Sequence, residues 1–288
     1  MALSTHEHAL ALQRAWVPEH LVDYVVAVSG KEPFMLGEFL CYTAEKVAVV
    51  VGYPLRGPFQ VDALAGLLEE VRERFQPRRI SLLAPELPTW RGLKPQGGRD
   101  HYFRLELTDQ RPPSKVRNMV RRASRELEIS ETGPMERAHL DLVAEFLARK
   151  DLSEETRVLL RGLPSYVGLD GVLLLNAWDR RGRLVAFSIG HMSQGDYGFY
   201  MFSFASRRHG VPGSSDLLLC ALVDRAKKQG KRFLNMGLGI GPGVRFFKEK
   251  WGAKPFVPYL EASSSGWSLG RLLGALLTRP GRGPGDDK

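Results

Sequence analysis

Cysteine is scarce in this sequence, since Cys41 and Cys220 are the only two in 288 residues. Their spacing fits neither a disulfide framework nor a zinc site, which excludes the small disulfide-stapled and zinc-binding classes. Long apolar runs are also lacking: Val47–Val51 has the size of a strand, far short of the ~20 residues that a membrane-spanning helix needs. The segment Met1–Trp16 lacks the basic start and apolar core of a secretory signal. We therefore expect a cytoplasmic protein without a bound metal.

The composition is that of a globular protein, with 43% hydrophobic and 25% charged residues. A chain of 288 residues suffices for one large domain or two ordinary ones. The net charge of +9 is unevenly spread, because segment 111–125 carries six lysines or arginines and no acid. Such a local excess predicts one anion-facing patch rather than a uniformly cationic surface.

Hydrophobic periodicity divides the chain into two α/β parts. In the first part, a helix is predicted at Val61–Phe75, because its apolar residues recur at spacings of three and four. The segment 85–98 is rich in proline and glycine and is predicted to be a loop. Strands are predicted at Val22–Val28, Phe34–Tyr42, Val47–Tyr53, Ile80–Ala84 and Tyr102–Leu107.

A basic helix is predicted after Pro112-Pro113, with Ser114 as its cap. One of its faces is apolar and is expected to be buried, while Arg117, Arg121 and Arg125 form a basic face. Beyond it the predicted order is strand, two helices, three strands, helix, strand, helix and strand. These elements are Leu127–Ser130, Met135–Lys150, Ser153–Arg161, Val172–Trp178, Leu184–Met192, Tyr197–Phe204, Leu217–Lys228, Phe233–Met236, Val244–Trp251 and Phe256–Glu261.

The segment 207–216 joins the predicted strand Tyr197–Phe204 to the predicted helix Leu217–Lys228. Glycines in such a turn let backbone amides approach a ligand, and a helix start offers free N–H groups to an anion. We predict a phosphate-binding turn made by Arg207, Arg208, Gly210, Gly213, Ser214 and Ser215. The alternative is an ordinary helix start, since many helices begin with glycine, proline and serine.

The order of the second part resembles the GNAT acyltransferase fold, whose phosphate-binding turn reads Arg or Gln, two residues, Gly, one residue, Gly or Ala. Arg207, Gly210 and Gly213 match this pattern with one extra residue. The segments Arg117–Ala123, 233–237 and 244–252 resemble the FemABX-like branch of that superfamily and the soluble domain of phosphatidylglycerol lysyltransferase. The resemblance implies an α/β protein with two tandem GNAT-like domains, each a mixed sheet flanked by helices. The implied divisions are an N-terminal half at 1–110, a basic linker helix at 111–126, a C-terminal GNAT domain at 127–262 and a tail at 263–288.

Members of these families transfer an acyl or aminoacyl group from acyl-CoA or aminoacyl-tRNA to an amine or hydroxyl. The resemblance therefore implies an acyltransferase with one of these two co-substrates, and it places Lys248 near the reacting carbonyl. A solvated helix lysine is the alternative reading of Lys248. The residues expected to contact substrate are Arg117, Arg121, Arg245 and Asn235. The basic helix could track the phosphates of a tRNA, or it could be an ordinary solvated face.

His191 and Tyr200 are further candidates for the general base, because they fall on adjacent predicted strands near the place where a GNAT sheet opens for substrate. A hairpin turn around Gly195-Asp196, with aromatic flanks, explains the same residues structurally. The glycine run 237–243 could indicate a dinucleotide site, but that fingerprint requires glycine where Pro242 stands. We therefore interpret the glycines as a flexible wall beside the site.

The tail after Glu261 combines serines with Trp267, several leucines and two arginines. Such a segment is typical of an interfacial helix that touches anionic lipid, so we predict peripheral membrane contact. Docking of the tail on its own domain is the alternative, and the last nine residues are expected to be disordered. A second hypothesis for the whole protein is a non-catalytic module that recognises a phospholipid, a nucleotide or RNA, since no general base is evident.

Overall fold

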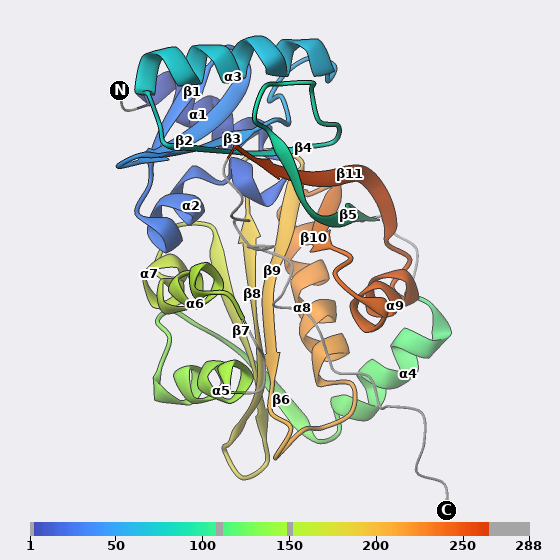
Figure 1. The fold of residues 1–288 in the computed structure, drawn as a ribbon. Coiled ribbons are helices and arrows are strands. Elements are labelled where there is room, and N and C mark those ends of the chain that lie inside the picture. The colour runs from blue at the N-terminus through green and yellow to red at the C-terminus, as the bar shows by residue number, and fades with distance from the viewer. Residues whose placement is uncertain (1–2, 108–111, 149–151, 265–288) are drawn as a thin grey trace, which may run out of the picture.

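The computed structural model describes residues 3–107, 112–148 and 152–264 (Figure 1). Its strands are β1 (Glu32–Leu36), β2 (Phe39–Ala44), β3 (Val47–Val51), β4 (Arg79–Ala84), β5 (Lys94–Glu106), β6 (Leu127–Thr132), β7 (Val172–Asp179), β8 (Leu184–Met192), β9 (Tyr197–Ala205), β10 (Phe233–Leu238) and β11 (Lys254–Ser263). Its helices are α1 (Thr5–Arg14), the 3-10 helix η1 (Pro18–His20), α2 (Val22–Ser29), α3 (Val61–Phe75), α4 (Ser114–Ala123), α5 (Arg137–Leu147), α6 (Glu154–Arg161), α7 (Leu163–Val167), α8 (Ser214–Lys228) and α9 (Pro242–Lys250).

The strands of both parts form one continuous sheet in the order β1-β2-β3-β4-β11-β5-β10-β9-β8-β7-β6. β11, the last of the described strands in chain order, lies between β4 and β5 and is antiparallel to both. β5 pairs in turn with β10. The two parts therefore share strands at their junction, where β5 and β11 bind them together. The division of the chain into two GNAT-like domains stays a prediction.

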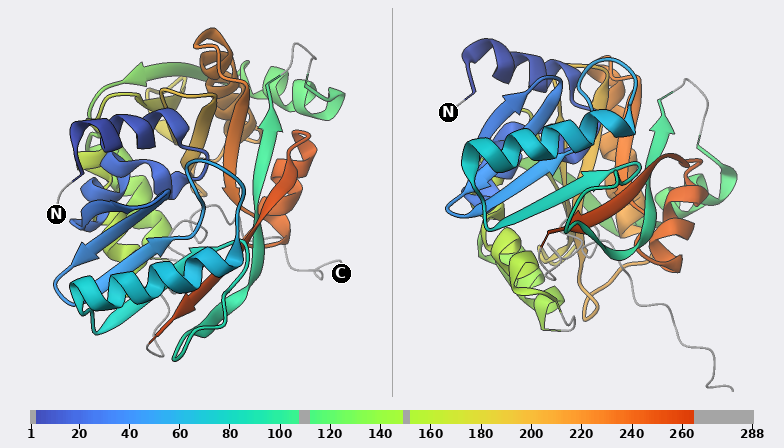
Figure 2. Two further views of the ribbon diagram at one scale, coloured as in Figure 1. Left: turned by 90° about the horizontal axis from the view of Figure 1, so that it is seen from above. Right: turned by 45° about the horizontal axis from the view of Figure 1, so that its top comes forward.

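Helices cover both faces of this sheet. In the first part, α3 packs on one face, and α1 and α2 lie on the other (Figure 2). In the second part, α5, α6 and α7 pack on one face of β7–β9, and α4 and α8 pack on the opposite face. The predicted helix Val61–Phe75 is confirmed as α3, because Leu64, Leu67, Leu68 and Val71 form its buried stripe.

The prediction of a strand at Val22–Val28 is wrong, since this segment is helix α2. Its β-branched residues favour a strand locally. The helix is nevertheless bounded by the turn at η1 and by Gly30, whose φ of 64° suits a left-handed helix end. Tyr24 and Val28 lie one helical turn apart and are both buried, so the helix places them on one face toward the core.

Other boundaries also differ from the prediction. The single strand predicted at Phe34–Tyr42 is a hairpin, because the chain turns at Gly37 with φ 56°. β5 begins at Lys94, inside the predicted loop 85–98, because it pairs with β11. Ser114 is the first helical residue of α4 rather than its cap, and Pro113 occupies the cap position. The short elements α1, η1 and α7 have no counterpart in the predicted order.

Candidate active site

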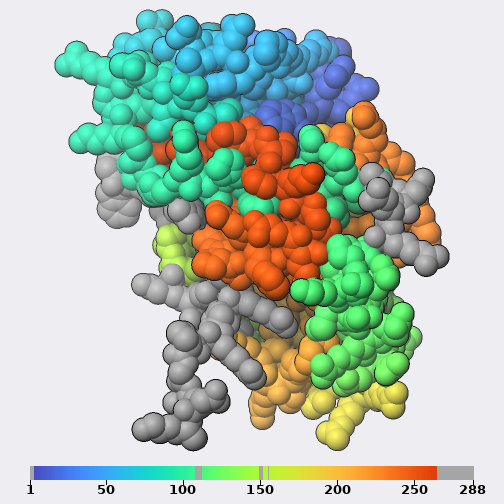
Figure 3. Space-filling model, turned by 90° about the vertical axis from the view of Figure 1, so that its right-hand side faces the viewer, coloured from blue at the N-terminus to red at the C-terminus, as the bar shows by residue number. Residues whose placement is uncertain are grey.

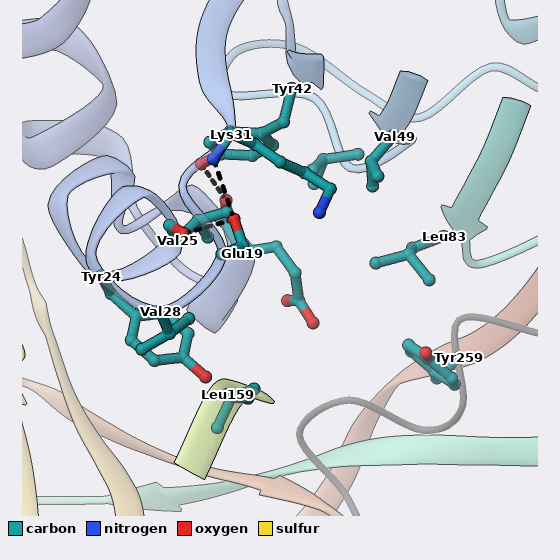
Figure 4. Close-up of a pocket in the computed structure, with 12 residues that line it drawn as sticks. Glu19, Tyr24, Val25, Val28, Lys31, Tyr42, Val49, Leu83, Leu159 and Tyr259 are labelled. Carbon is teal, nitrogen blue, oxygen red and sulfur yellow. Dashed lines mark hydrogen bonds between the residues drawn. The ribbon is translucent and has the colours of Figure 1, made fainter. Parts of the chain in front are cut away.

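A pocket lies where elements of the two parts meet (Figure 4). The segment around η1, α2 and β2–β4 provides most of its wall, and Leu159 of α6 and Tyr259 of β11 complete it from the second part. It encloses about 600 Å³ of empty space, with open solvent at its mouth included. Its aliphatic wall consists of Val25, Val28, Val49, Val51, Leu83 and Leu159. A concave, mostly apolar site with a few polar groups is the usual form of a small-molecule site.

Glu19 and Lys31 are the ionisable groups that line this pocket, and Glu19 is the buried one. It is the middle residue of η1, and its carboxylate points into the open space (Figure 4). The hydroxyl of Tyr102 donates to this carboxylate. Burial raises the pKa of Glu19 to about 7, and the hydrogen bond from Tyr102 offsets part of the rise. A carboxyl group with such a pKa gains and loses a proton readily at neutral pH, as a general base must.

The turn that carries Glu19 is held from two sides. Nε2 of His20 donates to the carbonyl of Tyr53 at 2.9 Å, and the hydroxyl of Tyr42 donates to the carbonyl of Glu19 at 2.7 Å. Burial lowers the pKa of His20 to about 4, so its ring is neutral at pH 7. The backbone of η1 is thus anchored to the first part of the sheet while the side chain of Glu19 faces the pocket.

Tyr24 brings a second polar atom to the pocket. It is 2% exposed, and its hydroxyl is buried with no hydrogen-bond partner among the described residues. Its ring packs on Tyr166 of α7, with 4.7 Å between the ring centroids. A buried hydroxyl without a partner is unfavourable, and a polar group of a ligand would satisfy it.

His191 lies one layer behind this pocket. Its Nδ1 is 3.0 Å from the hydroxyl of Tyr166, and the two rings stack. Burial lowers the pKa of His191 to about 4, so the ring is neutral at pH 7. His191 therefore supports Tyr166, which in turn packs on Tyr24.

Tyr200 lies on the other side of the sheet. His191 pairs with Phe199 across β8 and β9 and shares its face, whereas the next residue, Tyr200, points to the opposite face. There Tyr200 stacks on Phe247 of α9, with 6.3 Å between the ring centroids. The two candidate bases consequently do not share one site.

Lys248 is fully buried rather than solvated. Its Nζ donates to the carbonyl of Leu238 at 2.5 Å and lies 5.6 Å from the centre of the Phe103 ring. Burial lowers the pKa of Lys248 to about 7, and the negative charge of Asp100 opposes part of this shift. In this arrangement Lys248 holds the end of β10 under α9.

The glycine run 237–243 wraps around Asp100. The backbone N–H groups of Gly239 and Ile240 donate to its carboxylate at 3.1 and 2.8 Å. Gly239 also has no room for a side chain, because a Cβ there would lie 2.7 Å from Asp100 Oδ1 and 3.6 Å from Nε of Arg245. Arg245 thus lies beside this turn, and the close approach of a protein carboxylate explains the glycine.

Asn235 fastens the amino-terminal segment to β10. Its amide donates to the carbonyl of Trp16 at 2.8 Å, and its oxygen accepts from the N–H of Gly237 at 2.7 Å. The side chain is 1% exposed. Its expected contact with substrate stays a prediction, and its contacts within the protein are structural.

The predicted phosphate-binding turn leads into α8 through Gly213, which has φ 88°. A Cβ on Gly213 would lie 2.7 Å from the carbonyl oxygen of Met119 in α4, and one on Gly210 would lie 2.6 Å from the carbonyl oxygen of Ser206. Packing within the protein therefore accounts for both glycines without a ligand.

Around the start of α8, Arg207 and Arg208 are exposed, Ser215 is half-buried and Ser214 is buried. The hydroxyl of Ser214 has no hydrogen-bond partner among the described residues. The backbone N–H of Arg207 donates to Glu145 at 2.9 Å. Whether this turn holds a phosphate stays a prediction.

The two faces predicted for the basic helix are present in α4. Val116 and Ala123 are buried, whereas Arg117 and Arg121 are exposed. Arg125, the third residue predicted for the basic face, is also exposed but lies beyond the end of α4. α4 and α9 appear on the same face of the molecule (Figure 3). Arg245, on α9, has an exposed side chain.

The pocket around Glu19 was missed by the sequence patterns. Glu19 and His20 follow Pro18 and precede an apolar segment that we predicted as a strand, so the two residues had no assigned place. A proline at a helix start followed by two ionisable residues and a buried helix is the signal that could have identified them.

The predicted membrane-contacting tail after residue 264 lies outside the described residues. In the part of the chain that the structure describes, no helix is both long and apolar enough to cross a bilayer.

Comparison of the sequence with family models and with curated proteins finds no match. Solved structures do match. L-PGS from Bacillus licheniformis superposes with a TM-score of 0.55 at 16% identity, over 88% of this chain and 92% of that one. FemX gives a TM-score of 0.57 at 11% identity, over 90% and 96%.

A tandem GNAT protein from the clavulanic acid biosynthesis pathway gives a TM-score of 0.56 at 13% identity, over 93% of this chain and 98% of that one. At these identities the likeness concerns the fold. The predicted resemblance is confirmed at that level: the chain has the mixed α/β fold of the tandem GNAT-like acyltransferases.

Proposed function

We propose that this protein is an acyltransferase that transfers an acyl or aminoacyl group to an amine or hydroxyl bound beside Glu19. The observation that carries the proposal is the buried carboxylate of Glu19, which faces an apolar pocket and accepts a hydrogen bond from the neutral hydroxyl of Tyr102. The likeness in fold to FemX, L-PGS and a tandem GNAT protein supports the reaction class.

The chemistry requires a base, because an amine or hydroxyl must lose a proton to attack a carbonyl. Glu19 takes this proton as the acceptor nitrogen or oxygen bonds to the acyl carbon. The C–S bond of a thioester, or the C–O bond of an aminoacyl ester, then breaks. The proton held by Glu19 passes to the leaving sulfur or oxygen, so the carboxylate is restored and no further reactant is needed.

The donor is acyl-CoA or aminoacyl-tRNA, and we propose that its phosphates bind where the cationic face of α4 meets the start of α8. The exposed cations there support this placement, as does the hydroxyl of Ser214, which has no hydrogen-bond partner among the described residues. α8 and α2 pack on opposite faces of the sheet. The acyl arm would reach the acceptor where the pairing of β9 with β10 ends, after Phe199 and Asn235.

The test measures transfer from both donors. Purified protein is incubated with acetyl-CoA and a panel of amines and alcohols while free thiol is recorded, and in parallel with charged tRNA while new amide or ester is recorded. We expect turnover with one donor and a loss of about 100-fold in Glu19→Gln. Glu73→Gln, at an exposed position of α3, is the matched control and should leave turnover unchanged.

Arg208→Ala should weaken donor affinity without changing the KM of the acceptor, because Arg208 is exposed beside α8 and far in sequence from the pocket residues. The proposal would be refuted if neither donor supported transfer, or if Glu19→Gln kept full activity. Binding of a donor without turnover would instead favour the second hypothesis, a non-catalytic anion-binding module.

A further inference from the structure

The segment that follows Asn235 diverges from β9. Pairing between the parallel strands β9 and β10 ends with Phe199 and Asn235, while β9 continues beside β8 as far as Ala205. β10 continues beside β5, and its register shifts between Asn235 and Leu238. The position of segment 236–238 therefore does not come from pairing with β9, and other contacts must fix it.

This segment leads into a strained turn. The N–H of Gly241 donates to the carbonyl of Gly239 at 2.6 Å, which closes a three-residue turn around Ile240. Ile240 has φ 53°, a left-handed value that a β-branched residue rarely adopts. A three-residue turn with positive φ at its centre is the rare and strained form. Such a conformation persists only where the surrounding structure imposes it.

The carboxylate of Asp100 on β5 imposes this turn. One of its oxygens accepts from the N–H of Gly239 at 3.1 Å and from the N–H of His101 at 2.8 Å, and the other accepts from the N–H of Ile240 at 2.8 Å. Hydrogen bonds from N–H groups to a carboxylate are stronger than those between neutral groups. Asp100 is 4% exposed, so water does not replace these bonds. Asp100 thus fastens the turn to β5.

Asn235 fixes the other end of segment 236–238. Its side-chain oxygen accepts from the N–H of Gly237, which has φ 73°. One buried polar side chain therefore holds the segment at its start, and a second holds it at its end. Asn235 also binds the carbonyl of Trp16, so Asp100 is the one whose contacts concentrate on the turn.

We propose that Asp100 is a positioning residue, which holds the turn 239–241 and so keeps segment 236–238 away from β9, leaving room for the acyl-bearing arm of the donor. This rests on the proposed function in one respect, the placement of the donor arm where β9 and β10 part. A wall that is fixed in advance costs the donor no reorganisation on binding. Release of the turn would therefore weaken binding of the arm and leave binding of the phosphates intact.

A role as counter-charge is the alternative for Asp100. Its negative charge favours the charged form of Lys248 and so raises a pKa that burial lowers. The two roles differ in their dependence on Ile240. Glycine adopts a positive φ without steric strain, so a turn with glycine at its centre needs the carboxylate less. The interaction of Asp100 with Lys248 does not involve the side chain of Ile240.

Equilibrium binding to the full chain tests the proposal with probes that differ in the arm. Acetyl-CoA is compared with adenosine 3′,5′-bisphosphate, which has nucleotide phosphates but no arm, and charged tRNA is compared with the same tRNA uncharged. We expect one of the two pairs to show tighter binding of the probe that carries the arm. In Asp100→Asn this preference should fall at least about fivefold. The affinity for the probe without the arm should stay within about twofold of wild type.

Ile240→Gly separates the two roles of Asp100. In the Ile240→Gly background, Asp100→Asn should reduce the preference for the arm by less than about twofold, because both substitutions act on one turn. Ile129→Gly is the matched control, since Ile129 is also half-buried but is not among the residues with positive φ. It should restore nothing. Asp62→Asn, at an exposed position of α3, should leave the preference unchanged.

Ile240→Pro reaches the turn without altering Asp100, so the proposal is tested even if Asp100→Asn does not fold. Proline has no N–H to donate to Asp100 and fixes φ at about −65°, which is incompatible with the φ of 53° at this position. The preference for the arm should fall as in Asp100→Asn. Ile240→Ala keeps the N–H group and should keep most of the preference.

An unchanged preference in Asp100→Asn or in Ile240→Pro, a loss that Ile240→Gly does not reduce, or no preference in wild type would overturn the proposal. The proposed function fails separately, because binding requires no turnover. If the variants bind as expected but neither donor supports transfer, the role of Asp100 stands and the transferase does not. If transfer occurs and Asp100→Asn keeps the preference for the arm, the transferase stands and the role of Asp100 does not.

Discussion

The hydroxyl of Tyr102 lies 2.8 Å from each carboxylate oxygen of Glu19. Tyr102 belongs to β5, which pairs with β11 and β10 at the junction of the two parts, whereas Glu19 lies on η1 near the amino terminus. The group that we propose as the base is therefore held by the strand that joins the two parts. Its proton affinity depends on an interaction between segments 83 residues apart.

Tyr102→Phe removes the hydrogen bond that stabilises the charged form of Glu19. Since this bond lowers the pKa of Glu19, its loss should raise that pKa further. We expect the pH at which acyl transfer reaches half of its maximum to rise by about one unit, as measured from kcat/KM against pH. Tyr53→Phe, whose hydroxyl donates instead to the carbonyl of Pro258, is the control and should leave the profile in place. A profile of Tyr102→Phe that coincides with wild type would contradict the assignment.

Glu19 also makes folding stability depend on pH. Its pKa is about 7 in the folded protein against 4.5 ordinarily, so the stability it contributes is complete below about pH 4.5 and is lost as pH rises through 7. Gln cannot ionise and keeps an oxygen to accept from Tyr102. As the pH rises from 4.5 to 8, the free energy of unfolding of Glu19→Gln should therefore increase relative to that of wild type by up to about 3 kcal/mol.

Urea denaturation of both proteins across this pH range measures that difference. Glu73→Gln provides the baseline for an exposed glutamate. A constant difference between Glu19→Gln and wild type would show that Glu19 is not protonated on burial.

Lys248 should make folding stability depend on pH in the direction opposite to that of Glu19. Its pKa is about 7 in the folded protein against 10.5 ordinarily, so the stability it contributes is present above about pH 10.5 and is lost as pH falls through 7. Lys248→Met removes the charge and also the bond to Leu238. The free energy of unfolding of the variant, taken relative to that of wild type, should therefore be higher at pH 6 than at pH 10, by up to about 4 kcal/mol.

The same variant distinguishes a positioning role from direct catalysis. A lysine that holds β10 under α9 should be replaceable by a buried methionine with less than about tenfold loss of transfer. A group that stabilises the oxyanion directly should cost about 100-fold or more. Denaturation curves at pH 6 and pH 10, together with kcat, separate the two roles. The control is Lys254→Met, at an exposed position of β11.

Gly213→Ala tests the packing of α4 on α8. The residue has φ 88°, and an added Cβ would lie 2.7 Å from the carbonyl oxygen of Met119. We expect a loss of at least about 2 kcal/mol from backbone strain and displacement of α4. Gly230→Ala is a matched control, because Gly230 has φ 70° and nothing within 4 Å of the added Cβ. Stability is measured by thermal or urea denaturation. Equal losses in the two variants would show that displacement of α4 does not reduce stability.

Local periodicity predicted much of the fold. α3 was identified because its apolar residues recur at helical spacing and are buried as that spacing requires. α8 and the strands β7 to β9 were also identified, although β8 is buried at every position rather than on one face. α2 was not, because its valines favour a strand unless the flanking turn and Gly30 are considered. The start of β5 at Lys94 was also hidden, since its pairing with β11 joins segments more than 150 residues apart.

The candidate site could be predicted only in part. Lys248, His191 and Tyr200 were selected by resemblance and strand position, and the structure places them under α9, behind Tyr166 and on the opposite face of the sheet. Glu19, Tyr24 and Tyr102 come from three separate elements, and no local pattern links them. Their proximity is a property of the tertiary fold.

The position of β11 has a consequence for synthesis of the protein. Among the described strands β11 is synthesised last, yet it fills an interior position between β4 and β5. Until it emerges, β4 and β5 present bare edges, which are the template on which chains aggregate. A chain truncated before β11 is thus expected to aggregate more readily than one that contains this strand.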